Sequence, residues 1–538
     1  MSAEVDSIVR ILLWIALIAI LYLNYRAWQQ DYALAKRELA TAMVAQSPGV
    51  LATAPPRTET VGAAQIVRVR TDVLDIDIDL HGGGLRRADL LVYPQVKGHP
   101  EPVRLFNEDR PETRFALYSG LTGPDESLRP THRATFSSAA ADFRLADDAR
   151  ELRVPLTWTD HHGVRVTKTF VFHRGSYRIS IEQHVENTSG AAWVTAPYVQ
   201  LLRDDPKVEG SMLKAESRAF RGPAIYDGRA YRKLDIEKQT DARLDQEVTG
   251  GWLAALQHHF VAAIVPLPSE PYRYTLDAQG REYLLSAVGG ERTVAPGASA
   301  DFDTTVFVGP KLQAQLEATG TQLERVADYG LLTPIAKPLF WLLSKVHAGV
   351  GNWGWAIVIV TALLKLVFYP LSEASGRSMA KMKALAPGIK ALQEEHKEDR
   401  DALGRAMMDL YRREKVNPVS GCVPTILQFP VFAALYWVLL ESAEMRQAPF
   451  AGWITDLSAH DPFFILPAIM AAAMFAQSRL QGSTNVDPMQ RKMLTLMPIA
   501  MSAMFALLPA GLVLYYVVNT LLSIAQQWNI NRRLQLAR

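Results

Sequence analysis

A lysine lies inside a long apolar stretch of the sequence. Between Trp355 and Leu371 the chain reads WAIVIVTALLKLVFYPL, and Lys365 stands within this run instead of at its edge. A cation at membrane depth is costly unless it reaches water, a counterion or a polar cavity. One explanation is that the long lysine stem lifts the ammonium to the interface near Tyr369, about 6 Å farther along a helix.

Polar residues at helical spacing favour a second explanation. Thr361 and Tyr369 fall four residues before and after Lys365, on the same helix face, and Thr425 and Gln428 share a face of a later segment. Lipid-facing helices do not need polar stripes, so we expect these faces to converge on an interior that holds water. A further segment carries such a stripe at Tyr516, Asn519, Thr520 and Ser523.

The later apolar segments provide no counterion for this lysine. Apart from Glu441 at an outer edge, they contain no aspartate or glutamate. A buried cation without a partner is expensive, and a proton-coupled transporter would normally carry a carboxylate in the membrane. The sequence therefore predicts a hydrated groove that is open to the cytoplasm. In this groove Lys365 would be available to bind an acidic or polar segment that enters it.

The elements that must position these residues are apolar helices. The chain has 538 residues, of which 49% are hydrophobic and 21% charged, and the apolar residues concentrate in separate stretches. A bilayer core of about 30 Å needs roughly 20 helical residues. NYRAW follows the first stretch directly, without a cleavage site of small residues, which favours a retained anchor. Six spans are predicted at 8–25, 353–371, 424–440, 463–478, 493–508 and 511–528.

The distribution of Lys and Arg predicts the orientation of these spans. Basic residues are abundant in the loops 372–418 and 479–492 and in the tail 531–538, whereas the loop 441–462 has only Arg446. Cytoplasmic loops carry the excess of Lys and Arg. We therefore expect both termini in the cytoplasm and the long region after the first span outside.

The exported region reads as β-structure after a flexible linker at 28–60. VRVTKTFVFHRGSYRISIEQHVENTSG, residues 164–190, predicts two long alternating strands joined at RGS, and similar strands recur to about residue 308. A large antiparallel sandwich explains this pattern better than a barrel. The predicted domains are an anchor at 1–27, the linker, a β-domain at 61–325, an amphipathic interfacial helix at 326–350, a membrane core at 351–530 and a basic tail at 531–538.

Several motifs in the chain suggest chemistry but are better explained by structure. Asp75, Asp77 and Asp79 alternate with apolar residues and should form the solvated face of a strand. HGGG at 81–84 resembles an esterase oxyanion loop, but the chain has no G-x-S-x-G elbow, so a turn is expected. The adjacent histidine pairs 161–162 and 258–259 should point apart in strands. Cys422 alone supports neither a disulfide framework nor a zinc site.

The charged segment 373–416 has two apolar helical stripes with HKEDRD, residues 396–401, between them. It predicts an antiparallel helical hairpin on the cytoplasmic side. Its methionines could form an adaptable docking face or pack the hairpin against itself. Its basic residues favour anionic headgroups or ribosomal RNA.

The sequence resembles the YidC-type membrane protein insertases of the YidC/Oxa/Alb group, in their Gram-negative branch. The resemblance is dense over about 335–530. It is carried by SMAKMKALAPGIKALQ (378–393), EKVNPVSGCVPTILQFPVFAALY (414–436), MRQAPFAGWITDLSAHDPFFILP (445–467), DPMQRKMLTLMP (487–498) and GLVLYY (511–516).

The resemblance implies a multi-domain protein of the bacterial inner membrane. Its fold would be six transmembrane α-helices, a five-helix insertase core plus the N-terminal anchor, with a large periplasmic antiparallel β-supersandwich and the cytoplasmic hairpin. It implies an insertase and folding chaperone, not an enzyme, which works without a cofactor, a metal or a catalytic residue. The implied partners are nascent membrane proteins, the ribosome, the Sec translocon, anionic membrane lipids, and the signal recognition particle with its receptor.

The resemblance also assigns residues to the groove. Lys365 would be its positive residue; many relatives have arginine there, so this chain keeps the charge but lacks the fork-shaped, bidentate contact that arginine makes. Met504 stands where some relatives have an aromatic residue. The other groove residues implied or placed there by the polar stripes are Thr361, Gln428, Thr425, Phe432, Met470, Tyr515, Tyr516 and Asn519.

Two other functions are compatible with parts of the sequence. A small-molecule or lipid transporter would also have a polar membrane cavity, but its spans should repeat, and the sequence has no internal repeat. An exported carbohydrate-active enzyme would carry its chemistry in residues 60–310. No G-x-x-x-x-G-K-[ST] phosphate loop is present, so nucleotide-driven transport is not expected.

Overall fold

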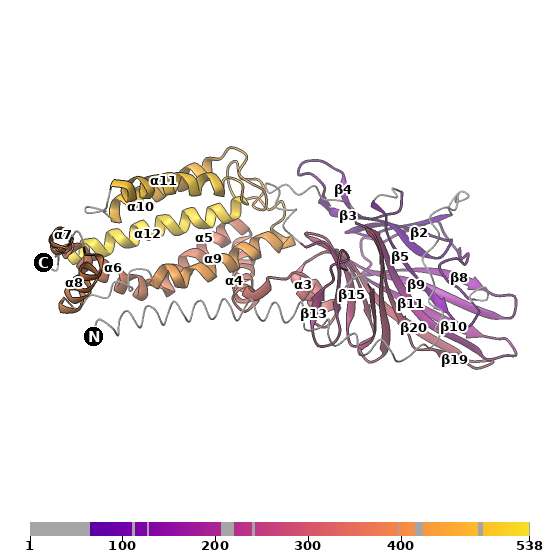
Figure 1. The fold of residues 1–538 in the computed structure, drawn as a ribbon. Helices are drawn as coiled ribbons and strands as arrows, with labels where there is room; N and C mark the ends of the chain where they lie inside the picture. The colour runs from indigo at the N-terminus through magenta and orange to yellow at the C-terminus, as the bar shows by residue number, and fades with distance from the viewer. Residues whose placement is uncertain are drawn as a thin grey trace. The chain divides into compact units, whose positions relative to one another are not determined.

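The computed structural model describes residues 65–109, 113–125, 129–205, 220–238, 243–396, 399–414, 423–481 and 488–536 (Figure 1). The predicted anchor at 1–27, the linker at 28–60 and Cys422 lie outside these residues. The chain forms two compact units. Described residues 65–328 and Glu441–Glu444 form a β-unit, and the other described residues from Tyr329 onward form a helical unit.

The β-unit is a sandwich of two sheets, which confirms the predicted sandwich. In the larger sheet, strand β19 (Arg292–Val294) pairs with β11. The order of its other strands is β14 (Arg243–Thr249), β17 (Pro271–Gln279), β18 (Glu282–Gly289), β11 (Trp193–Asp204), β5 (Phe115–Thr122), β4 (Pro102–Asn107), β3 (Gly84–Pro94), β2 (Leu74–Asp79), β1 (Ile66–Arg70) and β7 (Asp142–Arg144).

The second sheet contains the two strands that the sequence placed around RGS. Strands β9 and β10 pair antiparallel with Ile179 opposite Phe172, which confirms the predicted hairpin. Among the described strands of both sheets, the only parallel pair is β7 with β1, which belongs to the larger sheet. The order in this sheet is β13 (Tyr231–Lys233), β12 (Gly222–Tyr226), β15 (Trp252–Leu256), β16 (Phe260–Pro266), β20 (Ser299–Pro310), β10 (Arg178–Asn187), β9 (Val164–His173), β8 (Glu151–Thr159) and β6 (Ser137–Ser138).

The core of the sandwich lies between the sheets, because alternate residues of each strand point to the same face. Strand β10 shows this alternation, with Ile179, Ile181 and Val185 buried. Fully buried Ile76 of the larger sheet and Phe170 of the second sheet belong to one continuous apolar cluster. Helix α3 (Gln313–Thr319) and the 3₁₀ turn Leu323–Val326 follow the last strand of this unit.

The aspartates of strand β2 do not form a solvated face, contrary to the prediction. Asp77 and Asp79 are buried, and arginines of strand β3 pair with both: Arg87 lies opposite Asp77, and Arg86 donates to Asp79 at 3.0 Å. Arg87 donates to Asp75 at 2.8 Å and to Asp77 at 2.7 Å, and it also pairs with Asp89. Burial alone would raise the pKa of Asp77, but the bonds and charges of Arg87 and Arg68 outweigh it and lower that pKa.

HGGG forms a turn, as predicted, and its carbonyls hold a buried lysine. Gly82 has φ +91°, a backbone conformation that favours glycine. Lys168 of β9 is fully buried, and its ammonium donates to Gly83 O at 2.8 Å and to Ser119 O of β5 at 2.7 Å. It thereby links the two sheets. Burial lowers the pKa of Lys168 to about 7.

The helical unit begins with the 3₁₀ turn Gly330–Leu332 and helix α4 (Thr333–Val350). Ala336, Leu339 and Leu343 of α4 are buried, whereas Trp341 is 61% exposed, so the helix has one packed face. The helices that follow are α5 (Trp353–Val367), α6 (Tyr369–Ala384), α7 (Ala386–Glu395), α8 (Arg400–Arg413), α9 (Val423–Glu441), α10 (Ile465–Gln481), α11 (Pro488–Phe505) and α12 (Ala510–Leu536), with a 3₁₀ turn at Ala443–Met445.

The predicted spans correspond only in part to these helices. Among the described residues, no single helix is long and apolar enough to cross a membrane alone. Trp353–Val367 and Tyr369–Ser378 satisfy that criterion together, but they form a pair bent by 59°. The break is at Phe368, two residues before Pro370, which has no N–H to donate to Leu366 O and whose ring would clash with that carbonyl in a continuous helix. Six continuous spans are therefore not confirmed.

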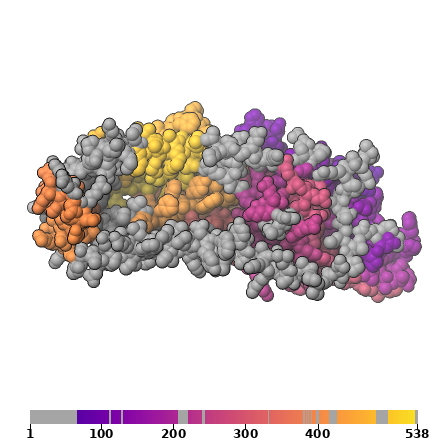
Figure 2. All heavy atoms as spheres, in the orientation of Figure 1, coloured from indigo at the N-terminus to yellow at the C-terminus, as the bar shows by residue number. Residues whose placement is uncertain are grey.

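The segment predicted as a helical hairpin contains α6, α7 and α8. A break at Leu385 separates α6 from α7, and Asp399 caps α8 by accepting from the backbone N–H groups of Asp401 and Ala402. In Figure 2 the orange residues of this segment form one end of the helical unit. Part of the predicted turn, residues 397–398, lies outside the described residues, so the hairpin stays a prediction.

Candidate functional site

The start of helix α5 is fixed by contacts that place its lysine. Asn352 caps the helix by accepting from the backbone N–H of Trp355, and its side-chain amide donates to Phe450 O at 2.9 Å. A methyl group on Gly354 would lie 2.1 Å from the Phe450 ring, so only glycine fits there without rearrangement. These contacts fix the position and rotation of α5. They therefore determine the direction in which Lys365, on the last turn of α5, points.

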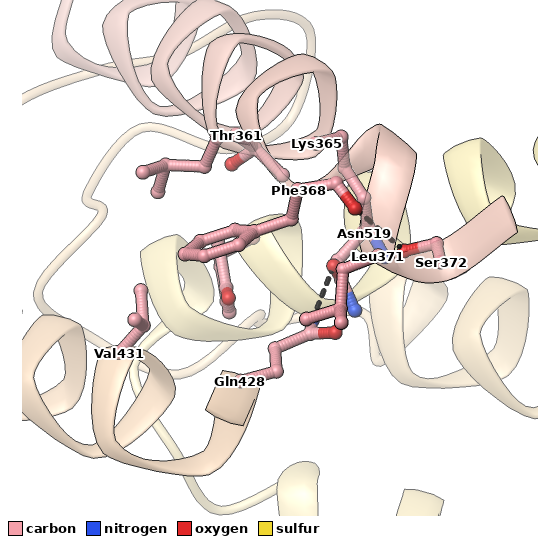
Figure 3. A pocket seen from close by; sticks show the side chains of 10 residues that line it. Thr361, Lys365, Phe368, Leu371, Ser372, Gln428, Val431 and Asn519 are labelled. Carbon is pink, nitrogen blue, oxygen red and sulfur yellow. Dashed lines mark hydrogen bonds between the residues drawn. The ribbon is translucent and has the colours of Figure 1, made fainter. Parts of the chain in front are cut away.

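The last turns of α5 border a small cavity within the helical unit (Figure 3). Its volume is about 30 Å³, which is room for about two water molecules. Its lining comes from α5 and the start of α6, from α9 and from α12: Thr361, Leu364, Lys365, Phe368, Leu371, Ser372, Gln428, Val431, Tyr515 and Asn519.

The ammonium of Lys365 donates to Ser523 Oγ of α12 at 2.8 Å. It therefore turns toward a neighbouring helix, as the explanation based on polar stripes requires. Within the part of the chain that the structure describes, no carboxylate lies within 4.0 Å of this ammonium. The cation is thus hydrogen-bonded but not neutralised.

Amide groups of α9 and α12 meet on the same cavity. Gln428 Nε2 donates to Asn519 Oδ1 at 2.5 Å, as the dashed line in Figure 3 marks. Thr361 contributes a buried side chain whose hydroxyl donates to Ile357 O of its own helix at 2.6 Å. The polar side chains of Lys365, Gln428 and Thr361 are therefore hydrogen-bonded within the protein.

An aromatic cluster lies beside the cavity. Phe432 of α9 stacks on Tyr515 with ring centroids 6.0 Å apart and meets the edge of Tyr516 at 5.9 Å. Phe505 of α11 contacts Phe432 and Tyr516 at 6.1 and 5.0 Å. Apolar and aromatic surface thus lies next to the polar groups. Such a surface is complementary to a polypeptide that has an apolar helix and a polar end.

The structure brings together only some of the groove residues predicted from the sequence. Thr361, Lys365, Gln428, Tyr515 and Asn519 line the cavity. Phe432 and Tyr516 lie next to it in the aromatic cluster.

Of the other two predicted groove residues, one lies away from the cavity and the side chain of the other is outside the described part of the chain. Met470 of α10 is fully buried in the core of the helical unit and does not reach it. Thr425 belongs to the first turns of α9, but its side chain lies outside the described residues.

Sequence reasoning missed several lining residues. Leu364 and Phe368 follow Thr361 at helical spacing, so the face shared with Thr361 already pointed to them. Ser372 lies beyond the bend between α5 and α6, and reading 353–371 as one straight helix concealed its position. Ser523 was recognised as part of a polar stripe, but nothing in the sequence indicated that it receives Lys365.

The β-unit has a separate, larger polar cleft of about 550 Å³. Two of its arginines are held in ion pairs: Arg104 donates to Asp89, and Arg203 donates to Asp205. Among the described residues, no group of three or more His, Cys, Asp or Glu side chains could hold a metal ion.

The two histidine pairs are not in strands, contrary to the prediction. Residues 161–162 lie in the turn between β8 and β9, and residues 258–259 lie between β15 and β16. Turn backbone does not alternate as a strand does, so adjacent side chains need not point apart. The rings of His258 and His259 in fact stack, with centroids 3.8 Å apart.

Comparison with known proteins gives matches over nearly the whole chain. The family model "60Kd inner membrane protein" matches residues 345–537, and "YidC periplasmic domain" matches residues 66–342. The membrane protein insertase YidC of Thioalkalivibrio sulfidiphilus is 43% identical, over 98% of this chain and 99% of the relative. That of Nitrosococcus oceani is 42% identical, over 98% and 99%. A crystal structure of an active YidC insertase aligns at TM-score 0.38 and 18% identity, over 86% of this chain and 92% of that chain.

The two family models together cover the helical unit and the β-unit, and the two insertase relatives are 43% and 42% identical over 98% of this chain. Proteins of this family reside in the inner membrane, carry a periplasmic domain, and insert membrane proteins without being enzymes. The chain therefore belongs to the YidC family of membrane protein insertases.

Proposed function

We propose that the chain inserts membrane proteins by accepting the polar end of a nascent chain at the cavity around Lys365 and releasing the apolar helix sideways into the bilayer. The observation that carries this proposal is a cation on a polar cavity with no carboxylate in ion-pair distance among the described residues. An acidic or polar substrate segment would supply the missing partner.

The free energy of this process needs no nucleotide. A helix of about 20 apolar residues is stabilised by transfer from water to lipid, and the barrier is the passage of its polar flanks. A polar cavity lowers that barrier by replacing part of their hydration. The neighbouring aromatic cluster would shield the apolar part meanwhile, which is the chaperone component of the proposal.

The proposed topology has both termini in the cytoplasm and the β-unit in the periplasm, following the distribution of basic residues. Segment α6 to α8 would then receive substrates, because Arg377, Arg405 and Arg413 are exposed on it. Such residues suit ribosomal RNA and anionic lipids. We include the Sec translocon, the signal recognition particle and its receptor as proposed partners. Affinity isolation of the full chain from solubilised membranes, with and without ribosomes, tests these contacts.

Removal of the cation tests the proposed role of Lys365. In cells depleted of their own insertase and supplied with Lys365→Ala, we expect a substrate with an acidic exported tail to insert about tenfold less well, because its carboxylates lose a charge-assisted partner. A substrate that differs only in having a neutral tail should be affected less. Protease protection of the exported tail measures both.

Lys365→Arg is the matched control, because it keeps the charge and should retain most insertion of the acidic substrate. Equal loss of both substrates in Lys365→Ala would contradict an electrostatic role.

Photo-crosslinking tests whether substrates occupy the cavity. A crosslinker at Gln428, which lines the cavity, should capture ribosome-bound nascent chains. The control is Phe429, the next residue of α9, which is 68% exposed and does not line the cavity. Equal capture from both positions would show that chains contact α9 without entering the cavity.

A further inference from the structure

Ser523 of α12 has a hydrogen-bonding geometry that fixes its role toward Lys365. Its hydroxyl donates to Asn519 O, one turn earlier in the same helix, at 2.7 Å. A serine hydroxyl has one proton, so once that proton is used the oxygen can only accept. The ammonium of Lys365 supplies the donor at 2.8 Å. The contact is therefore one-directional, from the cation of α5 to the oxygen of α12.

A second contact joins α12 to α9 at the same level. The side chain of Asn519, whose backbone carbonyl holds Ser523, accepts from Gln428. The sequence of contacts Lys365, Ser523, Asn519 and Gln428 thus connects three helices around the cavity. We call these four residues the polar clasp. The cavity beside them has room for about two water molecules, far less than a peptide segment needs.

We propose that Ser523 is a positioning residue, which holds the Lys365 ammonium on α12 and yields it to an acidic substrate segment. This inference rests on the proposed function, because it specifies how the cation of that site is kept ready. Ser523 need not touch substrate. Its effect passes through Lys365.

The exchange is favourable because the two acceptors differ in charge. A hydroxyl oxygen is a neutral acceptor, whereas a carboxylate forms a shorter and stronger charge-assisted bond with an ammonium. The hydrogen bond to Ser523 is therefore strong enough to orient the lysine side chain, but it is weaker than the bond that a carboxylate of an acidic tail would form. A resident aspartate or glutamate at this position would neutralise the cation permanently.

The test uses the full-length protein in insertase-depleted cells and the two substrates with acidic and neutral exported tails. The readout is the ratio of acidic-tail to neutral-tail insertion, which a smaller amount of folded protein does not change. For Ser523→Ala we expect this ratio to fall about fivefold, which corresponds to the net contribution of one typical hydrogen bond. Ser523→Thr keeps the hydroxyl and should restore the ratio.

Ser523→Asp provides the opposite perturbation. Its carboxylate would pair with Lys365 and remain bound, so the ratio should fall to the value of Lys365→Ala. In the double variant Lys365→Ala with Ser523→Ala, the ratio should equal that of Lys365→Ala alone, because a residue that acts only through the lysine has no further effect without it.

The outcomes separate this inference from the proposed function. If Lys365→Ala lowers the ratio but Ser523→Ala does not, or if Ser523→Ala lowers it further in the absence of the lysine, the positioning role is wrong and the proposed function stands. If Lys365→Ala itself leaves the ratio unchanged, the proposed function fails first. A ratio that Ser523→Thr fails to restore also overturns the role of the hydroxyl.

Discussion

The two units of this protein each contain a lysine that lacks a carboxylate partner among the described residues, and they treat it differently. Lys168 in the β-unit is fully buried and surrounded by backbone carbonyls. Lys365 in the helical unit borders a cavity and has one hydroxyl partner. A fully coordinated cation stabilises its surroundings, whereas a partly coordinated one can bind something else. The roles of the two lysines therefore differ because of the groups that accept their hydrogen bonds and because Lys365 borders a cavity. Burial of the side chain alone does not distinguish a structural lysine from a functional one.

The largest expected effect is on the structural lysine. Lys168→Met keeps the apolar stem but leaves the carbonyls of Gly83 and Ser119 without their donor, in a fully buried site. We expect the free energy of unfolding of the β-unit to fall by about 3 kcal/mol. Hydrogen–deuterium exchange of the purified full chain measures this as lost protection in β5 and β9.

The control for Lys168→Met is Arg165→Ala on the same strand. Arg165 is 61% exposed and makes one long surface ion pair with Glu186 at 3.9 Å, so its loss should change stability by less than about 0.5 kcal/mol. Unchanged protection in Lys168→Met would show that the carbonyl contacts of Lys168 are not needed for the stability of the β-unit. Lys168 would then not be a structural residue.

A pH dependence of stability should also distinguish the wild type from Lys168→Met. The pKa of Lys168 is lowered to about 7 in the folded state from an ordinary value of 10.5, so between these values the unfolded chain binds more protons. The stability of the β-unit should therefore rise with pH across this window, by at most about 1.4 kcal/mol per pH unit for one group.

The contribution of Lys168 is complete above pH 10.5 and is lost as the pH falls to about 7. Hydrogen exchange at matched pH values, corrected for its intrinsic rates, measures the difference between the wild type and Lys168→Met. A constant difference across the window would show that Lys168 stays protonated in the folded state.

The smallest expected effect is on the stability of the helical unit. In Lys365→Ala the hydroxyl of Ser523 keeps its bond to Asn519 O, so no buried donor loses its partner. We expect the stability of α5 and α12 to change by less than about 1 kcal/mol, although insertion of acidic substrates falls. Protection of α5 and α12 amides in the purified full chain provides the measurement. A loss as large as that of Lys168→Met would make Lys365 a structural residue too.

The sequence anticipated the β-sandwich well because its strands alternate strictly. The pattern at 164–190 was enough to predict β9, β10 and their pairing, since period-two alternation fixes which residues face the core. It did not anticipate that Arg87 of β3 pairs with both Asp75 and Asp77. Which strand lies beside β2 is a long-range choice, and that choice turned an expected solvated face into a buried ion-pair network.

The sequence by itself determined that Lys365 shares a face with Thr361 and that Gln428 and Asn519 lie on polar stripes, because helical spacing is local. Its resemblance to the insertase family rests on motifs that are likewise local.

Only the tertiary structure decided that α5, α9 and α12 bring these stripes to one small cavity, that the helix bends before Pro370, that Met470 is buried elsewhere, and that Ser523 receives the lysine. The physical reason is that a hydrogen bond between residues 158 positions apart depends on how helices pack, which no local periodicity specifies.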